Sequence, residues 1–136
     1  MKRNDIAFVV GHDQIEQGAY SDILSMTEYE YNCKVANLLC NDFDIYYRDT
    51  EGGYNEKMTK LAKQVNPKKY DFVIELHFNK FNAKVQGCEA VIYPDNVISR
   101  SISNDILNSL VLDFNSDNRG VKEHYDGDRG FGFLSK

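Results

Sequence analysis

Short strand-like runs alternate with helical patterns along this sequence, and this alternation restricts the fold more than any other feature. Four runs are apolar or rich in β-branched and aromatic residues, as strands are: 6–10, 43–49, 70–78 and 87–94. Three segments carry apolar residues at helical spacing: 28–39, 55–65 and 99–114. Strands that alternate with helices predict a three-layer α/β structure, in which helices flank a mostly parallel, twisted sheet.

The helical segments also have recognisable ends and apolar faces. Thr27 can cap the first helix, and Pro67 follows the second. The side chains predicted to point inward are Tyr31, Val35, Leu38, Leu39, Met58, Leu61, Ala62, Val65, Ile102, Ile106, Leu110 and Phe114. The stretch 13–26 has no clear period and is predicted to be a loop. The tail 115–136 is predicted to contain turns and one short apolar segment, 131–134.

Size and charge exclude several kinds of protein. A chain of 136 residues, 42% hydrophobic and 12% aromatic, suits a single domain over residues 1–136. A formal net charge of -5 argues against a nucleic-acid partner, because binding to phosphates normally needs a basic face. No run approaches the roughly 18 apolar residues of a membrane span, so no membrane partner is expected. The N-terminus turns polar too soon for a signal peptide, so we expect the chain to be made in the cytoplasm.

Three cysteines, Cys33, Cys40 and Cys88, are an odd number at spacings unlike those of a zinc ribbon. Buried free thiols are the simplest interpretation, because free cysteine behaves as a small apolar side chain.

His12, Glu28 and His77 form a candidate metal site. Two imidazoles and one carboxylate are the ligand set of a catalytic zinc, which keeps a fourth position for water. His12 and His77 both follow predicted strands, and ligands collect beyond the carboxyl ends of parallel strands. Imidazole favours zinc over magnesium or calcium. The alternatives are that both histidines are structural, and that Glu28 only complements the positive end of a helix.

Two glutamates compete for the carboxylate position. Glu28 and Glu30 lie two residues apart, and a helix turns by about 200° over that distance, so only one of them can face the site. We expect Glu28 to face it and Glu30 to be solvated.

Several motifs appear in a familiar order: VVGHD at 9–13, QGA at 17–19, TEYEYN at 27–32, ELHFN at 75–79, GCE at 87–89 and NRGVK at 118–122. Together they resemble the zinc-dependent N-acetylmuramoyl-L-alanine amidases of the amidase type 3 group, which include phage endolysin catalytic domains. The resemblance implies that His12, Glu28 and His77 hold Zn²⁺. It also implies that the substrate is peptidoglycan, cut at the amide between N-acetylmuramic acid and L-alanine, after release of the protein to the cell wall.

The resemblance breaks down at the end of the chain. The family has its catalytic glutamate on a final strand, followed by a closing helix, and both would come after Lys136. We therefore expect the domain to lack that strand and helix, most simply through C-terminal truncation. An exposed sheet edge would then favour self-association. The alternative functions are an inactive zinc-binding module that binds or regulates at the wall, and a plain α/β ligand-binding domain.

Other polar residues are candidates for supporting roles. Glu75 shares a strand face with His77, and Glu89 lies in the GCE strand. Each could replace the missing base, although we favour a carboxylate that holds an imidazole by its free N–H. Three residues could contact substrate: Asn79, Arg119 and His124. For His124, an exposed loop residue without a role is an equal alternative.

Overall fold

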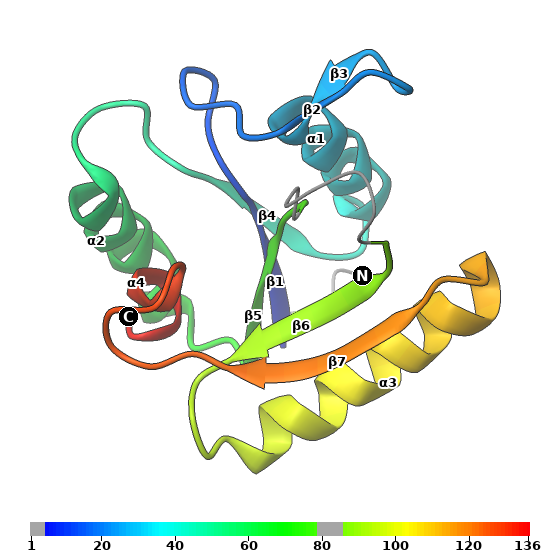
Figure 1. Cartoon of the computed structure of the whole chain (residues 1–136). Coiled ribbons are helices and arrows are strands. Elements are labelled where there is room, and N and C mark those ends of the chain that lie inside the picture. Colours follow the sequence, from blue (N-terminus) through cyan, green and yellow to red (C-terminus); the bar gives the residue numbers. More distant parts are fainter. Residues whose placement is uncertain (1–4, 79–85) are drawn as a thin grey trace. The chain divides into compact units, whose positions relative to one another are not determined.

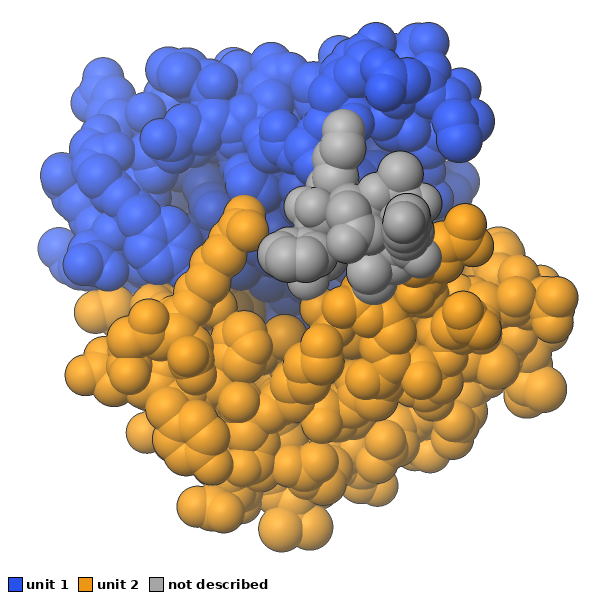
Figure 2. Space-filling model, viewed as in Figure 1, with its two compact units in different colours: residues 1–79 blue, residues 80–136 orange. Residues whose placement is uncertain are grey.

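The computed structural model describes residues 5–78 and 86–136, and the predicted alternation of strands and helices is present in them (Figure 1). The chain divides into two compact units, residues 1–79 and 80–136 (Figure 2). Each unit has its own sheet and helices, and the sheets are mostly parallel, as predicted. The expectation of one domain over residues 1–136 stays a prediction.

A parallel sheet forms the centre of the first unit. Its described strands are β1 (Ile6–Val10), β4 (Asp44–Tyr47) and β5 (Phe72–Leu76), in the order β4-β1-β5. The central strand β1 pairs with both neighbours and is the most deeply buried, because Ala7, Val9 and Val10 have no exposed surface. An almost entirely apolar sequence is what a strand covered on both faces requires.

Two helices connect these strands and cover both faces of the sheet. Helix α1 (Glu28–Leu39) leads from β1 to β4, and α2 (Tyr54–Val65) leads from β4 back past β1 to β5. A short 3₁₀ turn, η1 (Asn66–Lys68), ends α2. Because parallel crossovers are right-handed, this reversal of direction puts the helices on opposite faces, as Figure 1 shows.

Helix α1 begins as the sequence predicts. The hydroxyl of Thr27 accepts a hydrogen bond from the Glu30 amide, and the Glu30 carboxylate accepts one from the Thr27 amide at 2.8 Å. This capping box satisfies amides that the first turn leaves without helical partners. It also fixes the rotation of the helix, so that Glu28 points inward and Glu30 stays exposed.

The predicted inward face of α1 was only partly right, since Tyr31, Val35 and Leu39 are half-buried, whereas that of α2 was largely confirmed. In α1 the buried residues are Glu28, Asn32 and Ala36, and Leu38 is 80% exposed. Polar residues can occupy this face because each is hydrogen-bonded; the Asn32 side-chain amide donates to the Leu76 carbonyl oxygen at 2.9 Å. In α2, three predicted apolar residues are buried: Met58, Leu61 and Val65.

The stretch 13–26, predicted to be a loop, contains part of a small antiparallel pair. Strand β2 (Tyr20–Ser21) pairs with β3 (Met26–Thr27). Each strand is only two residues long, too short to show a period of two in the sequence. The pair leads directly into the first turn of α1.

The second unit is built on a strand–helix–strand unit. Strand β6 (Cys88–Ile92) and strand β7 (Asn118–Glu123) pair in parallel, and α3 (Val97–Phe114) connects them. A short helix, α4 (Phe131–Leu134), follows. The prediction of turns in the tail 115–136 was therefore wrong for 118–123, because β7 has the sequence NRGVKE, which is too polar to indicate a strand before its partner is known.

The predicted face of α3 was also only partly right, since Ile102 and Leu110 are half-buried. Its most buried residue is Leu107, whereas Ile106 is 42% exposed and Phe114 is 73% exposed. The helix begins two residues earlier than expected, with the Asn96 side chain accepting from the Ser99 amide. Apolar residues occur on several sides of α3, so spacing alone does not identify the side that meets β6 and β7.

Three remaining expectations concern the cysteines, the membrane and the chain end. The cysteines are free, as predicted, but none is buried: Cys33 and Cys88 are partly exposed, and Cys40 is exposed at the end of α1. None of the described helices is long and apolar enough to cross a bilayer. The expected absence of a final strand and helix, and self-association through a sheet edge, stay predictions.

The capping box gives a direct test of how α1 is held. Replacing Thr27 with alanine removes the hydroxyl that accepts from Glu30, and should lower the free energy of unfolding by about 1 kcal/mol in urea denaturation. Thr27→Ser keeps the hydroxyl and should stay within a few tenths of a kcal/mol of the wild type. Equal stability of the alanine and serine variants would show that the cap does not stabilise α1.

Candidate metal centre

His12, Glu28 and His77 come together at one edge of the first unit's sheet. His12 lies two residues after β1 and His77 one residue after β5, and these strands are neighbours. Glu28 is the first residue of α1. The chain leaves β1 toward one edge of the sheet and returns to β5 on the other side, so this is the point where ligands collect in open α/β sheets.

The three side chains lie within contact distance. The Glu28 Oε2 atom is 3.2 Å from His12 Nε2, and Glu28 Oε1 is 2.9 Å from His77 Nδ1. One ligand atom from each residue lies within 4.8 Å of the other two. The two imidazole rings stand nearly perpendicular, with centroids 5.1 Å apart. The carboxylate therefore lies between two ring nitrogens.

Backbone groups hold Glu28 in this position. Its Oε2 accepts from the Ala19 amide at 3.1 Å, and its Oε1 accepts from the Phe78 amide at 2.6 Å. The side chain is almost completely buried. Burial alone would raise the pKa of the carboxyl, but hydrogen bonds with His12, His77 and Ala19 outweigh it and hold the pKa well below its usual range. Glu28 is therefore an anion at neutral pH.

Two glycines allow the close packing of this site. A Cβ atom at Gly11 would lie 2.1 Å from the Leu76 carbonyl oxygen and 2.8 Å from His77 Cε1. A Cβ atom at Gly18 would lie 2.6 Å from Glu28 Oε2, and its φ of +76° also favours glycine. The glycines of the VVGHD and QGA motifs are thus required by contact with the proposed ligands.

His77 has a second set of partners on the other side of its ring. Its Nε2 atom is 3.2 Å from Glu75 Oε2 and 3.2 Å from Arg48 Nη2. Burial would lower the pKa of His77, but hydrogen bonds with Glu28 and Glu75 raise it to about 9. Glu75 lies where the sequence predicted, beside the imidazole on the same strand.

Sequence reasoning missed two cations at this edge of the sheet. Arg48 follows β4 and pairs with Glu75, with both side chains less than 10% exposed. Lys57 in α2 donates to Asp13 at 2.7 Å and to Glu16 at 2.9 Å. Lys57 lies four residues before Leu61 on the buried face of α2, so its spacing could have indicated burial. The pair with Asp13 anchors the loop that follows His12.

The other predicted site residues lie in the second unit or outside the described residues. Asn79 is outside them. In the second unit, the Glu89 carboxylate pairs with Lys122 and with Arg119, at 2.9 Å from the latter. His124 has its Nδ1 atom 2.8 Å from the Arg129 carbonyl oxygen. These contacts tie Glu89, Arg119 and His124 to neighbours in their own unit.

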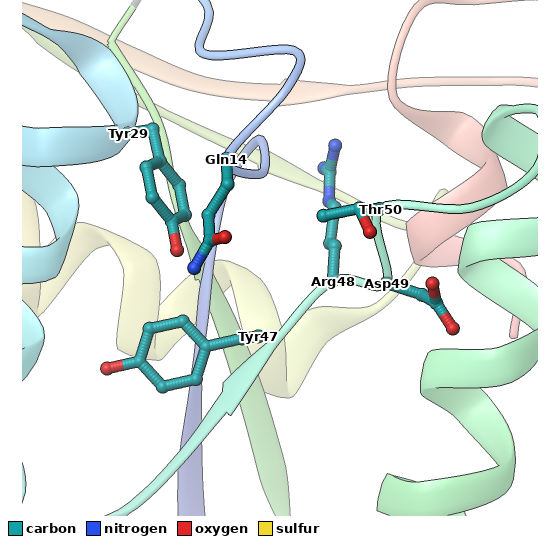
Figure 3. A pocket seen from close by; sticks show the side chains of 6 residues that line it. All are labelled: Gln14, Tyr29, Tyr47, Arg48, Asp49 and Thr50. Atoms are coloured by element: carbon teal, nitrogen blue, oxygen red, sulfur yellow. The ribbon is translucent and has the colours of Figure 1, made fainter.

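A pocket of about 440 Å³ opens near the ends of β1 and β4. Figure 3 shows its lining side chains. Tyr29 and Gln14 follow Glu28 and His12 closely in sequence, and Arg48 contacts His77 directly. In Figure 3 the side chains of Gln14, Tyr29 and Tyr47 gather on one side of the pocket, and Asp49 points away from them. The lining residues are Gln14, Tyr29, Tyr47, Arg48, Asp49 and Thr50.

The residues present fit a single divalent metal. Glu28 supplies an anionic oxygen, and His12 and His77 each turn a ring nitrogen toward it. Two nitrogens and one oxygen suit zinc, whose catalytic sites commonly use three protein ligands. Fold and site together define an α/β protein with a candidate mononuclear metal centre at the carboxyl ends of its strands.

Comparison with known proteins gives the family. Residues 6–134, nearly the whole chain, match the N-acetylmuramoyl-L-alanine amidase family. The chain therefore belongs to this family of enzymes. No curated protein matches the sequence.

The fold is similar to those of several solved structures. The catalytic domain of the CD27L endolysin, which targets Clostridia difficile, has a TM-score of 0.71 and 25% identity, over 88% of this chain and 69% of its own. An N-acetylmuramoyl-L-alanine amidase from Clostridium difficile 630 has a TM-score of 0.70 and 20% identity, over 96% and 72% of the two chains. The CwlD amidase from Clostridioides difficile, solved with the GerS lipoprotein, has a TM-score of 0.70 and 19% identity, over 90% and 73%.

Gly11 provides a test of the packing between β1 and β5. In Gly11→Ala the added methyl group would overlap the Leu76 carbonyl, which must move together with His77. We expect a loss of about 3 kcal/mol in the free energy of unfolding, measured in urea. Gly53→Ala is a matched control, because a Cβ there has no neighbour within 4 Å and the φ of -75° suits alanine. Equal stability of the two variants would contradict the close approach at Gly11.

Proposed function

We propose that this chain is a zinc-dependent amidase that cleaves the bond between N-acetylmuramic acid and L-alanine in peptidoglycan. Membership of the family supports the reaction and substrate. The observation that supports metal dependence is that ligand atoms of His12, Glu28 and His77 lie within 4.8 Å of one another. These three residues would hold the zinc.

The chemistry of the bond explains the need for a metal. When bound, zinc would polarise the scissile carbonyl and make a water molecule acidic enough to act as a nucleophile near neutral pH. The chain's own residues supply a preformed ligand set. Glu28 is already ionised and fixed by two backbone amides, so little reorganisation is needed when the metal binds.

The two glutamates considered as a general base have other partners. Glu75 pairs with Arg48 through one oxygen and faces His77 with the other. Glu89 pairs with Arg119 and Lys122. A general base must be free to accept a proton from water within hydrogen-bond reach. We therefore assign the base to neither residue and give Glu75 the role of holding His77.

The pocket lined by Arg48, which contacts His77, supports binding of a bulky polar substrate. Tyrosine rings offer apolar faces, and the side chains of Gln14 and Thr50 offer hydrogen bonds. Such a lining suits the sugar or peptide part of peptidoglycan next to the scissile amide.

Zinc binding is the first test. The wild-type chain should retain one zinc ion per molecule after exhaustive dialysis, measured by elemental analysis. His12→Ala, Glu28→Ala and His77→Ala should each lose it, because three protein ligands are needed to hold the ion. His124→Ala removes the one remaining histidine and should retain zinc. A wild-type chain that cannot be loaded with zinc would refute the proposed metal dependence.

Cleavage is the second test. Zinc-loaded protein incubated with purified peptidoglycan should expose new L-alanine amino groups without new reducing sugar ends, and His77→Ala should reduce the rate to background. Arg100→Met, a change in the second unit, should leave the rate unaltered. Stoichiometric zinc without any cleavage would favour the alternative of an inactive zinc-binding module at the cell wall.

A further inference from the structure

Two groups contact the Nε2 atom of His77, and they require opposite hydrogen-bonding states of this atom. Arg48 Nη2 lies 3.2 Å away and can only donate a hydrogen bond. Glu75 Oε2 also lies 3.2 Å away and, when ionised, can only accept one. The same ring nitrogen therefore faces one group that needs a lone pair and one that needs a hydrogen.

Whether Nε2 carries a hydrogen for Glu75 or a lone pair for Arg48 determines whether Nδ1, on the opposite side of the ring, can bind a metal. A neutral imidazole carries one N–H. If the hydrogen is on Nε2, it points to Glu75, and the lone pair on Nδ1 is available to a metal, which would replace the present contact between Nδ1 and Glu28. If the hydrogen is on Nδ1, that nitrogen cannot bind a metal. The partners of Nε2 thus control metal binding at Nδ1.

The contacts of Arg48 and Glu75 favour a hydrogen on Nε2. Two N–H groups of Arg48, on Nε and Nη2, both donate to a single oxygen of Glu75, Oε1; the Nε contact is 2.8 Å. The other oxygen, Oε2, is left facing His77. Both side chains are nearly buried, and the Arg48 guanidinium also lies over the Tyr54 ring, 5.6 Å from its centroid. Neither partner can rotate freely.

We propose that Arg48 and Glu75 are positioning residues that set the tautomer of His77. Arg48 holds Glu75 by Oε1, Oε2 accepts the Nε2 hydrogen, and Nδ1 is thereby presented to zinc with its lone pair. This inference rests on the proposed zinc site. It assigns to Arg48 a role that neither its position nor its type indicates in the sequence.

A simple structural ion pair would behave differently. If Arg48 and Glu75 only joined the ends of β4 and β5, zinc affinity would follow stability, and every substitution of Glu75 that removes its charge would act alike. If they set the tautomer, the hydrogen-bonding character of residue 75 matters. Glutamine and alanine at this position separate the two explanations.

Glu75→Gln should impair zinc binding more than Glu75→Ala. In the glutamine variant the amide oxygen is held by Arg48, so the NH₂ group faces His77 Nε2 and favours the tautomer that carries its hydrogen on Nδ1. Alanine leaves room for water, which can accept from Nε2. We expect a zinc affinity about 10- to 100-fold below wild type for Glu75→Gln, with Glu75→Ala between them, measured by competition with a chromophoric chelator.

Removing Arg48 should increase the zinc affinity of the Glu75→Gln variant. In Arg48→Met with Glu75→Gln, the amide is free to turn its oxygen toward Nε2, so the double variant should bind zinc more tightly than Glu75→Gln alone. The Arg100–Glu123 ion pair supplies matched controls, because Arg100→Met and Glu123→Gln make the same chemical changes within residues of the second unit. Both should leave zinc affinity unaltered.

The tautomer can also be observed directly in the wild type. Long-range ¹H–¹⁵N correlation of the zinc-loaded protein should show His77 bound through Nδ1 with its hydrogen on Nε2. Coordination through Nε2, or Glu75→Gln binding as tightly as Glu75→Ala, would overturn the inference while zinc binding by the wild type upholds the proposed function. Failure of the wild type to bind zinc would overturn both.

Discussion

The buried carboxylate of Glu28 is the group on which this site depends. A carboxylate that loses its water must be compensated by hydrogen bonds or opposite charge. Here the compensation comes from three segments: the imidazole of His12 after β1, the amide of Ala19 before α1, and the amide of Phe78 with the imidazole of His77 after β5. A displacement of any one of them would leave this buried charge with fewer partners. The same arrangement that stabilises the anion also prepares a ligand set for a cation.

The parallel sheet makes this meeting possible. Neighbouring parallel strands end at the same edge, so the pairing of β1 with β5 brings together residues 66 positions apart in the chain. The approach is close enough that Gly11 cannot carry a side chain, because the Leu76 carbonyl occupies the space. The arginine after β4 then reaches across to Glu75 and His77. Each strand of the sheet therefore contributes one part of the metal centre.

Local signals accounted for much of what could be predicted. Thr27 and Glu30 determine where α1 begins and which glutamate faces inward, because a capping box depends on residues three apart. The apolar runs located the strands, and the buried face of α2 followed from its spacing. Prediction failed where the partner was distant. Asn32 is buried because it bonds to the Leu76 carbonyl, and β7 is a strand because it pairs with β6.

The sequence by itself determined the α/β class, the positions of most helices and strands, the family, and the three candidate ligands. These depend on periodicity, caps and motif order, which are properties of neighbouring residues. Only the tertiary structure decided which atoms of those ligands face each other, which sides of α1 and α3 are covered, and that Arg48 and Lys57 are buried in ion pairs. A charged side chain can be buried only when the fold brings an opposite charge to it, and that partner lies 27 residues away for Arg48 and 44 residues away for Lys57.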